Sequence, residues 1–307
     1  MFMETIKIKN LTWVDIVDPK KEDIEYLKQN FDFHPIVLGE LTIHTLRPKV
    51  ENYDHYLYMV LHFPIYHPEE KTSKSMEIDF LITPTTLITV RYGKIQPLQE
   101  FWKKCEAKDI DPHFGETTAS LLYYMIGELN NFSSRQLDHI TRKIDDIEKE
   151  IFGTKNIKKE EKIVEEISIV RRDILDFRRI LKPQNTIFES LKTRGTEFFG
   201  KSEEPYFVDI IGDHMRVWNL LENNKETIES LQEANDSLLS NRTNRIMKII
   251  TLFAVIVFPL TLVAAIFGMN TKYLPIIGME NDFWIILGIM FIGTISMLIL
   301  FKIKKWL

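Results

Sequence analysis

The sequence predicts a membrane protein with an N-terminal cytoplasmic α/β domain, a long helical stalk and two C-terminal transmembrane helices. Three observations predict this class. Strand-like segments and a helix start share the first ~110 residues, helical periodicity takes over from about residue 116, and two apolar runs lie near the C-terminus. The runs, residues 249–267 and 283–301, are each 19 residues long and hold no ionisable side chain.

The two apolar runs have the length that a membrane span needs. At 1.5 Å per residue each would be about 28 Å long as a helix, close to the hydrocarbon thickness of a bilayer. Buried core helices of a soluble protein are the alternative, but they seldom run this far without polar residues on one side. Six basic residues flank the outer ends of the pair: Arg242, Arg245, Lys248, Lys302, Lys304 and Lys305. The loop between the runs holds only Lys272 against Glu280 and Asp282, so both termini are expected in the cytoplasm and the chain in the cell (inner) membrane.

Charge is unevenly distributed along the 307 residues. Residues 242–307 hold seven basic and two acidic residues, so the whole-chain net charge of −5 requires −10 on residues 1–241. An acidic domain argues against nucleic acid as a partner, because phosphate recognition needs a basic face. The acidity is compatible with cation binding, although a solvated surface is the simpler interpretation.

Enzymatic chemistry finds no support in the sequence. The eight histidines are scattered, and no nucleophile, base or nucleotide-loop constellation is present. His62 and His67 flank a short FPIY segment and are expected in a loop rather than as metal ligands. The single cysteine, Cys105, excludes an intrachain disulfide and a cysteine-cluster metal site.

The first expected domain, residues 1–115, mixes strand and helix signals. Four segments rich in β-branched and aromatic residues are bounded by Pro, Asp or Gly and predict strands at 11–17, 55–63, 76–83 and 86–92. Between the first two, Asp18 as a cap, Pro19 in the first turn and early acidic residues predict a helix start. The domain is therefore α/β or α+β, with a strand order that the sequence leaves open.

Residues 116–204 predict a cytoplasmic helical hairpin. Two apolar stripes recur at three- and four-residue steps, one from Leu137 to Ile151 and one from Val164 to Leu181. Such stripes are typical of helices packed side by side. The charged faces of both helices are interpreted as solvated.

One long helix is expected from about Pro205 to Phe267, as a stalk that runs into the first transmembrane helix at about residues 246–267. Residues 213–258 hold no Gly and no Pro, and a helix over 205–267 would be about 95 Å long. Its polar part is too rich in Asn, Glu and Ser to be buried throughout, so it is expected to stand beside copies of itself around a symmetry axis.

If copies of this helix surround an axis, one stripe of residues should face it. The residues at three- or four-residue steps are Asn244, Met247, Ile250, Ala254, Phe258, Thr261 and Ala265, followed by Gly268. The stripe is polar at its cytoplasmic end, apolar in the middle and polar again at its far end, an order that suits a pore gated by dewetting. Pro259 frees the carbonyl of Val255 and is expected to bend the helix there.

Several motifs resemble one known family. Residues 241–270, NRTNRIMKIITLFAVIVFPLTLVAAIFGMN, are followed by a short loop, a second span and the ending FKIKKWL. Together with LTWVDIVDPKKEDI, RPKVENYDHYLYMVLHF and EPYFVDIIGDHM in the same order, they resemble the CorA family of magnesium channels, whose hallmark is Gly-Met-Asn at the outer end of the first of two spans. The resemblance covers nearly the whole chain.

The resemblance implies a funnel-shaped homopentamer in which the first span lines the pore and the second forms the outer ring. Gly268, Met269 and Asn270 would form the selectivity filter. They open an external loop over residues 268–282, ahead of the second span at 283–301 and a basic cytoplasmic tail at 302–307. The family's pore-lining positions fall on the stripe that helical spacing also indicates: Asn244, Met247, Ile250, Ala254, Phe258 and Thr261. Phe258 stands where a methionine is common, and Ile250 where a leucine is.

Asn270 suits magnesium because Mg²⁺ gives up its six waters reluctantly. Uncharged amide oxygens can accept hydrogen bonds from the waters of the intact hydrated ion and still release it, whereas a ring of carboxylates would hold the ion too tightly. Capping of the helix C-terminus is the alternative role of Asn270. In the loop, Glu280 and Asp282 are expected to concentrate cations at the mouth; family members often carry an acidic residue just after the proline, where this chain has Ile276.

The resemblance also implies inhibition by intracellular Mg²⁺, bound by acidic residues between neighbouring cytoplasmic domains. Asp209 is the best match on the long helix, with Asp213 one turn further on, and the spacing leaves the choice between them open. Glu51 and Asp54 lie in the domain that would supply the other side. Mg²⁺ would thus be both the transported and the regulatory ion, driven inward by the membrane potential with about 4.6 kcal/mol per 100 mV.

Two other functions stay open. A transporter of the same architecture for Zn²⁺, Co²⁺ or Ni²⁺ is one, although zinc-transporting relatives tend to vary the middle residue of the tripeptide. The other is a membrane-anchored helical scaffold, which leaves the ordered stripe over residues 244–270 without a purpose.

Overall fold

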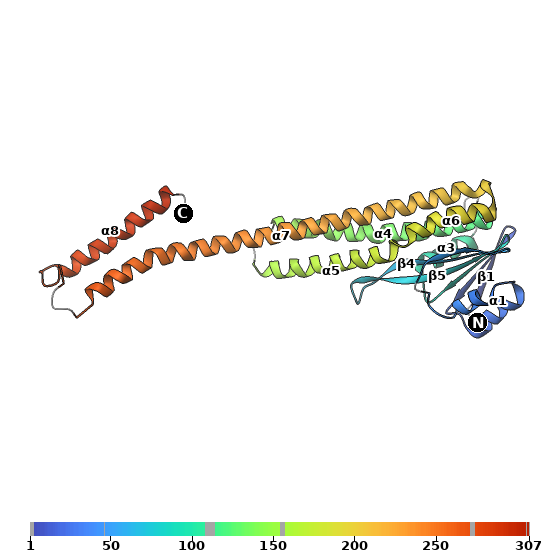
Figure 1. Cartoon of the computed structure of the whole chain (residues 1–307), viewed down its shortest axis with the longest axis horizontal. Coiled ribbons are helices and arrows are strands. Elements are labelled where there is room, and N and C mark those ends of the chain that lie inside the picture. Colours follow the sequence, from blue (N-terminus) through green and yellow to red (C-terminus); the bar gives the residue numbers. More distant parts are fainter. Residues whose placement is uncertain are drawn as a thin grey trace. The chain divides into compact units, whose positions relative to one another are not determined.

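The computed structural model describes residues 3–45, 47–107, 114–153, 157–270, 274–304 and 306. The chain divides into two compact units, Met1–Gln232 and Glu233–Leu307, and helix α7 (Glu204–Phe267) contributes to both. Figure 1 follows the elements in chain order, from blue at the N-terminus to red at the C-terminus.

The first unit is built on a sheet in which six strands are described. They are β1 (Met3–Ile8), β2 (Leu11–Val17), β3 (Lys49–Asn52), β4 (Leu57–His67), β5 (Thr72–Ile82) and β6 (Thr86–Arg91), in the spatial order β1-β2-β6-β5-β4-β3. β2 and β6 run parallel, and the other neighbouring pairs run antiparallel. The four predicted strands correspond to β2, β4, β5 and β6 and are confirmed.

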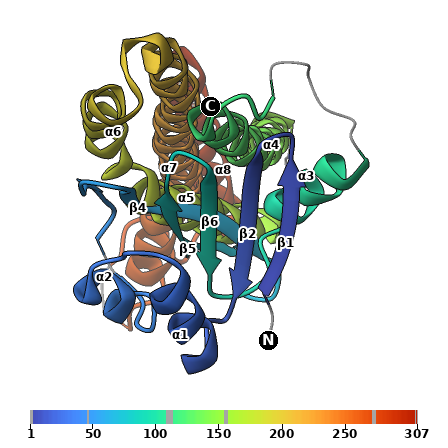
Figure 2. The same cartoon turned by 90° about the vertical axis from the view of Figure 1, so that its right-hand side faces the viewer.

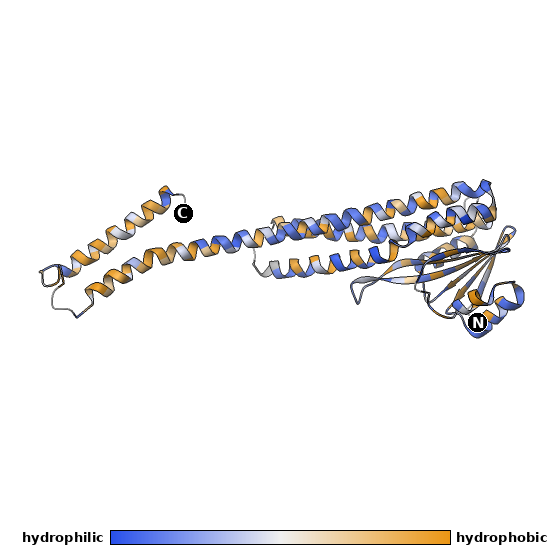
Figure 3. Ribbon diagram, in the orientation of Figure 1, coloured by the Kyte–Doolittle hydropathy of each residue, from blue (hydrophilic) through white to orange (hydrophobic). Residues whose placement is uncertain are grey.

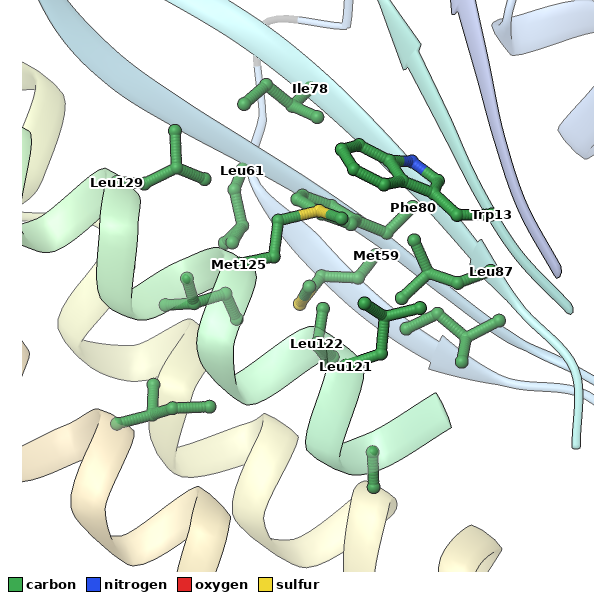
Figure 4. Close-up of a cluster of buried hydrophobic side chains, with 14 of the residues drawn as sticks. Trp13, Met59, Leu61, Ile78, Phe80, Leu87, Leu121, Leu122, Met125 and Leu129 are labelled. Atoms are coloured by element: carbon green, nitrogen blue, oxygen red, sulfur yellow. The ribbon is translucent and has the colours of Figure 1, made fainter. Parts of the chain in front are cut away.

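Helices cover both faces of this sheet (Figure 2). α1 (Lys21–Asn30) and α2 (Pro35–Glu40) pack on one face, where Leu27 and Val37 are fully buried. α3 (Gln96–Ala107) and α4 (Thr118–Gly153) pack on the other, and Figure 4 shows Met125 of α4 against Trp13 and Phe80 of the strands. The sheet therefore separates two apolar cores, as expected for an α/β layer architecture.

The core under α3 contains the single cysteine. Cys105 is 4% exposed and packs among the same apolar side chains as Phe101 and Leu98. Because burial disfavours the thiolate, it raises the pKa of the Cys105 thiol to about 12. The side chain is therefore a small apolar group of the core at physiological pH.

Three helices follow the sheet where two stripes predicted a hairpin. α4 and α5 (Ile157–Leu181) pack together as expected, and α7 joins them through Leu221 and Ile228. One stripe assignment was wrong: Val164 is 44% exposed, and Ile163 takes the buried position instead. α6 (Gln184–Phe199), which carries no long stripe, packs near β3 and β4, and a 3₁₀ turn (Lys201–Glu203) leads into α7.

The expectation that His62 and His67 lie in a loop was also wrong, because both belong to β4. The proline of the FPIY segment suggested a break. However, β3 pairs with β4 only from Leu57 to Val60, so Pro64 lies where β4 has β5 as its described neighbour and no ladder bond is lost. Gln136 of α4 then donates to the Pro64 carbonyl at 3.0 Å, which joins this part of the strand to the helices.

The second unit contains the end of α7 and α8 (Asp282–Ile303). Both helices hold an 18-residue window long and apolar enough to cross a membrane, with mean hydropathy 2.8 and 2.5, and neither window is buried within the chain. In Figure 3, the C-terminal part of α7 and most of α8 are orange. Side chains such as Phe253, 69% exposed, and Phe291, 67% exposed, need lipid or further protein as a partner. Pro259 lies inside α7, which continues through it as one helix.

Candidate functional site

The stripe on α7 is a continuous surface of one helix. At about 100° per residue, its members from Asn244 to Gly268 fall within an arc of roughly 120°. Within the chain, Met247 and Ile250 are each 57% exposed and Phe258 is 74% exposed, so this face has almost no intrachain packing. Other faces of this part of α7 are exposed as well, as Phe253 is, so the order of polar and apolar residues, and not exposure, distinguishes this face.

Polarity changes along the stripe in three steps. Asn244 begins it with an exposed amide, Met247 to Phe258 are apolar, and Thr261 adds a hydroxyl. The Thr261 hydroxyl donates to the carbonyl of Val257 at 2.9 Å, which leaves its oxygen free to accept. The far end therefore presents hydrogen-bond acceptors, to which the waters bound to a cation can donate. The apolar middle, in contrast, interacts weakly with water.

Gly268 to Asn270 end the helix without a charge. The Gly268 amide donates to the carbonyl of Ala264 at 3.0 Å, and the Met269 amide donates to that of Ile266 at 3.3 Å. A Cβ on Gly268 would lie 3.1 Å from the Ala264 oxygen, so a larger residue would require a small shift of that carbonyl. Because backbone amides already end the helix, the exposed Asn270 side chain is not needed as a cap, and among the described residues it has no hydrogen-bond partner.

The two acidic residues of the loop differ in their surroundings. Asp282 accepts from the amide of Phe283 at 2.6 Å and from that of Gly278 at 3.2 Å, so its carboxylate stabilises the turn that begins α8. Glu280 is exposed, and no described residue bonds to its carboxylate. Of the two, Glu280 is the group available to attract cations.

Asp209 and Asp213 lie one turn apart on α7, and each carboxylate has a neighbour that the sequence did not indicate. The Tyr123 hydroxyl of α4 donates to Asp209 Oδ2 at 2.7 Å. The Asp213 carboxylate pairs with the exposed guanidinium of Arg216. Partial burial, and secondarily the charge of Asp209, raise the pKa of Asp213 against the opposing effect of Arg216. The hydrogen bond to Asp209 is the main cause that raises the pKa of Tyr123. Cross-helix contacts of this kind leave no periodic signal in a sequence.

Glu51 and Asp54 belong to a different part of the unit. Glu51 on β3 accepts from Lys49 at 3.2 Å and from the Tyr53 hydroxyl at 3.1 Å. Burial first, and then the Glu51 charge, raise the pKa of Tyr53 to about 12. Asp54 lines a cavity of about 520 Å³ together with Glu197 of α6. Within the described part of the chain, no three His, Cys, Asp or Glu side chains are placed to hold a metal ion.

The two apolar helices, the α/β unit and the uncharged end of the stripe define a class: a two-span membrane protein with a large N-terminal domain. The family model of the CorA-like Mg²⁺ transporter proteins matches residues 9–305. The chain therefore belongs to the CorA-like Mg²⁺ transporter family, whose members transport divalent cations and are not enzymes.

Known proteins agree with this assignment over most of the chain. The cobalt/magnesium transport protein CorA of Thermotoga maritima is 26% identical over 304 residues, covering 96% of this chain and 83% of the relative. The divalent cation transporter CmaX of Pseudomonas aeruginosa is 24% identical over 190 residues, covering 62% of this chain and 56% of the relative. The complete structure of the CorA magnesium transporter from Methanocaldococcus jannaschii has a TM-score of 0.84 at 21% identity, covering 98% of this chain and 94% of that one. The fold class is thereby confirmed.

Proposed function

We propose that the protein takes up Mg²⁺ through a channel lined by the α7 helices of a homopentamer. The observation that carries this proposal is the uncharged Gly268–Asn270 end of a stripe that is polar, then apolar, then polar. Amide oxygens of Asn270 would accept hydrogen bonds from the waters of hydrated Mg²⁺, and the membrane potential would drive the ion inward. Both termini lie in the cytoplasm in this arrangement, and the pentamer forms a funnel.

Flux into proteoliposomes tests the filter. Asn270→Ala is expected to abolish Mg²⁺ uptake, because the acceptors for the hydrated ion are lost. Asn281→Ala is the matched control: it removes an exposed amide from the same loop, and that side chain makes no capping bond to α8. Wild-type uptake by Asn270→Ala would refute the filter, and no uptake by the unaltered protein would favour the scaffold function.

The same proposal includes inhibition by intracellular Mg²⁺. Intracellular Mg²⁺ would bind at Asp209 or Asp213 of one subunit and at Glu51 or Asp54 of its neighbour, and would hold the funnel closed. Asp209→Ala combined with Asp213→Ala is expected to leave current at millimolar internal Mg²⁺. Asp236→Ala, which removes an exposed carboxylate from the same helix, should keep the inhibition. If the double variant were inhibited as strongly as the wild type, this assignment would be abandoned.

The alternative is that the protein transports another divalent cation. The similarity of the chain to the divalent cation transporter CmaX is the observation that favours this alternative. Parallel flux measurements with Mg²⁺, Co²⁺, Ni²⁺ and Zn²⁺ separate the two. Preference for Mg²⁺ at equal concentration supports the proposal, and preference for Zn²⁺ replaces it.

A further inference from the structure

A cavity of about 900 Å³ lies at one edge of the sheet, and its lining residues do not include the proposed ligands of regulatory Mg²⁺. It is lined by residues of β1, β2, β6 and α3 and by the segment between β6 and α3. Its volume is in the range of sites that hold small molecules. The cavity has a structural reason to be there, which follows from the connections of β2 and β6.

β2 and β6 are parallel neighbours, and the chain leaves them toward opposite faces of the sheet. After β2 it passes to α1 in one core, and after β6 it passes to α3 in the other. In α/β sheets, such a divergence opens a crevice beyond the carboxyl ends of the two strands, and ligands bind there. Val17 at the end of β2 and Arg91 at the end of β6 both line the cavity.

Arg91 presents hydrogen-bond donors of fixed geometry to the cavity, and its charge is balanced by Asp15. The residue is 4% exposed, and its Nε and Nη2 groups donate to Asp15 Oδ2 at 3.1 and 2.8 Å. Its Nη1 group donates to the Gly93 carbonyl at 2.6 Å, and Thr89 also donates to Asp15 at 2.6 Å. These bonds to described residues leave two of the five guanidinium N–H groups for a ligand. A guanidinium held in this way recognises phosphate oxygens without first losing side-chain freedom.

The rest of the wall carries two lysines and an indole. Lys94 and Lys103 are exposed, and neither forms an ion pair with a described residue. The Trp102 ring packs edge-on against Trp13, 4.7 Å between centroids, and its N–H donates to Glu106 at 3.1 Å. Lys94 lies between β6 and α3, and Trp102 lies within α3. Lys103 is next to Trp102 in the sequence, so the cavity offers a cationic group between β6 and α3 and another beside the aromatic ring.

Carboxylates line the same cavity. Asp15 is neutralised by Arg91, but Glu4, Asp18 and Glu106 also face this space. A free polyphosphate would be attracted by the lysines and repelled by these groups. A polyphosphate that carries a divalent cation presents both signs, and so matches a wall of mixed charge.

We propose that this cavity binds a nucleoside triphosphate as its Mg²⁺ complex. The phosphates lie against Arg91 and Lys94, the base lies against the Trp102 indole, and the waters of the bound Mg²⁺ face Asp18. This site does not depend on the proposed ion pathway, because none of its residues belongs to the stripe or to the acidic residues that we propose as ligands of inhibitory Mg²⁺.

Equilibrium dialysis of ATP with the detergent-solubilised full chain tests the proposal. One saturable site per chain is expected with Mg²⁺ present, and weaker binding is expected with EDTA. Lys94→Gln combined with Lys103→Gln should weaken binding about tenfold or more. Lys104→Gln is the matched control, because this adjacent lysine of α3 pairs with Glu128 at 2.6 Å and does not line the cavity. Equal losses in both would show non-specific charge attraction and overturn the site.

The nucleoside half of the proposal has its own test. Trp102→Leu should weaken ATP binding about tenfold and leave Mg²⁺–tripolyphosphate binding unchanged, since the polyphosphate has no base to stack. Tripolyphosphate that binds as tightly as ATP would overturn nucleoside recognition. Free ATP that binds more tightly than its Mg²⁺ complex would overturn the role of the carboxylates, and no saturable binding at millimolar ATP would overturn the site.

Discussion

Replacing Tyr123 by Phe removes one hydroxyl from the contact between α4 and α7. In the wild type that hydroxyl donates to Asp209 Oδ2 at 2.7 Å and withdraws negative charge from a carboxylate that we propose as a ligand of regulatory Mg²⁺. A hydrogen bond to a charged group contributes about 1.5–3 kcal/mol when buried, but Asp209 is exposed, so about 0.5–1 kcal/mol is reasonable. The variant should therefore bind inhibitory Mg²⁺ about two- to fivefold more tightly.

Flux into proteoliposomes loaded with graded Mg²⁺ measures this effect as a lower half-inhibitory concentration, with uptake at zero internal Mg²⁺ unchanged. The direction separates two roles of Tyr123. If the hydroxyl only held α4 against α7, its loss would loosen the closed state and raise the half-inhibitory concentration. A raised or unchanged value would refute the competition between Tyr123 and the ion. Arg216→Gln, which frees the Asp213 carboxylate on the same helix, should shift inhibition in the same direction as Tyr123→Phe.

Three further predictions follow from single side chains. Phe258→Ala should widen the apolar middle of the stripe, so Mg²⁺ flux should rise and persist at inhibitory internal Mg²⁺; unchanged current in liposomes would exclude Phe258 from the constriction. Glu280→Gln should slow uptake at low ionic strength but not near 1 M salt, because salt screens the attraction of cations. Asp282→Asn should instead lower thermal stability, because the side chain loses its contacts with the turn before α8. If uptake by both variants depended on salt in the same way, the different roles of Glu280 and Asp282 would be contradicted. Burial raises the pKa of Asp79 to about 7, so the folded state keeps this carboxyl protonated at pH values where the unfolded state has lost the proton. The stabilising contribution of Asp79 is therefore complete below pH ~4 and is lost as pH rises through 7. The apparent Tm should fall over this interval, and it should fall less steeply in Asp79→Asn.

Several of the elements that the sequence predicted have long or strongly periodic patterns, whereas the shorter β2 and β6 were recognised by their β-branched residues. β4 and β5 hold 11 residues each, and α4 and α5 repeat apolar residues over many turns. β3 holds only four residues, so its pattern is too short to recognise. The sequence pattern indicated Val164 as a member of the buried stripe in place of Ile163 because both are apolar β-branched residues. Only packing against α4 decides which of the two is buried.

The two halves of the candidate site differ in what a sequence can reveal. The stripe that we propose as the lining of the pore lies on one helix, so spacing alone places Asn244, Phe258 and Thr261 on a single face. The contact between Tyr123 and Asp209 joins residues 86 positions apart on different helices. Such a pair depends on how the helices pack, and no local pattern records it. The residues of a regulatory metal site between subunits depend on contacts between different chains, which no local pattern shows. That site therefore stays a prediction.

The buried thiol of Cys105 has a practical consequence for following the motion of this protein. A thiol whose pKa is raised to about 12 and whose sulfur is shielded in the α3 core reacts slowly with maleimide and methanethiosulfonate reagents. A cysteine introduced at an exposed position such as Ser240 can therefore be labelled selectively with the native residue left in place. Spin or fluorescent probes at that position would report the distances between copies of α7 as internal Mg²⁺ is raised.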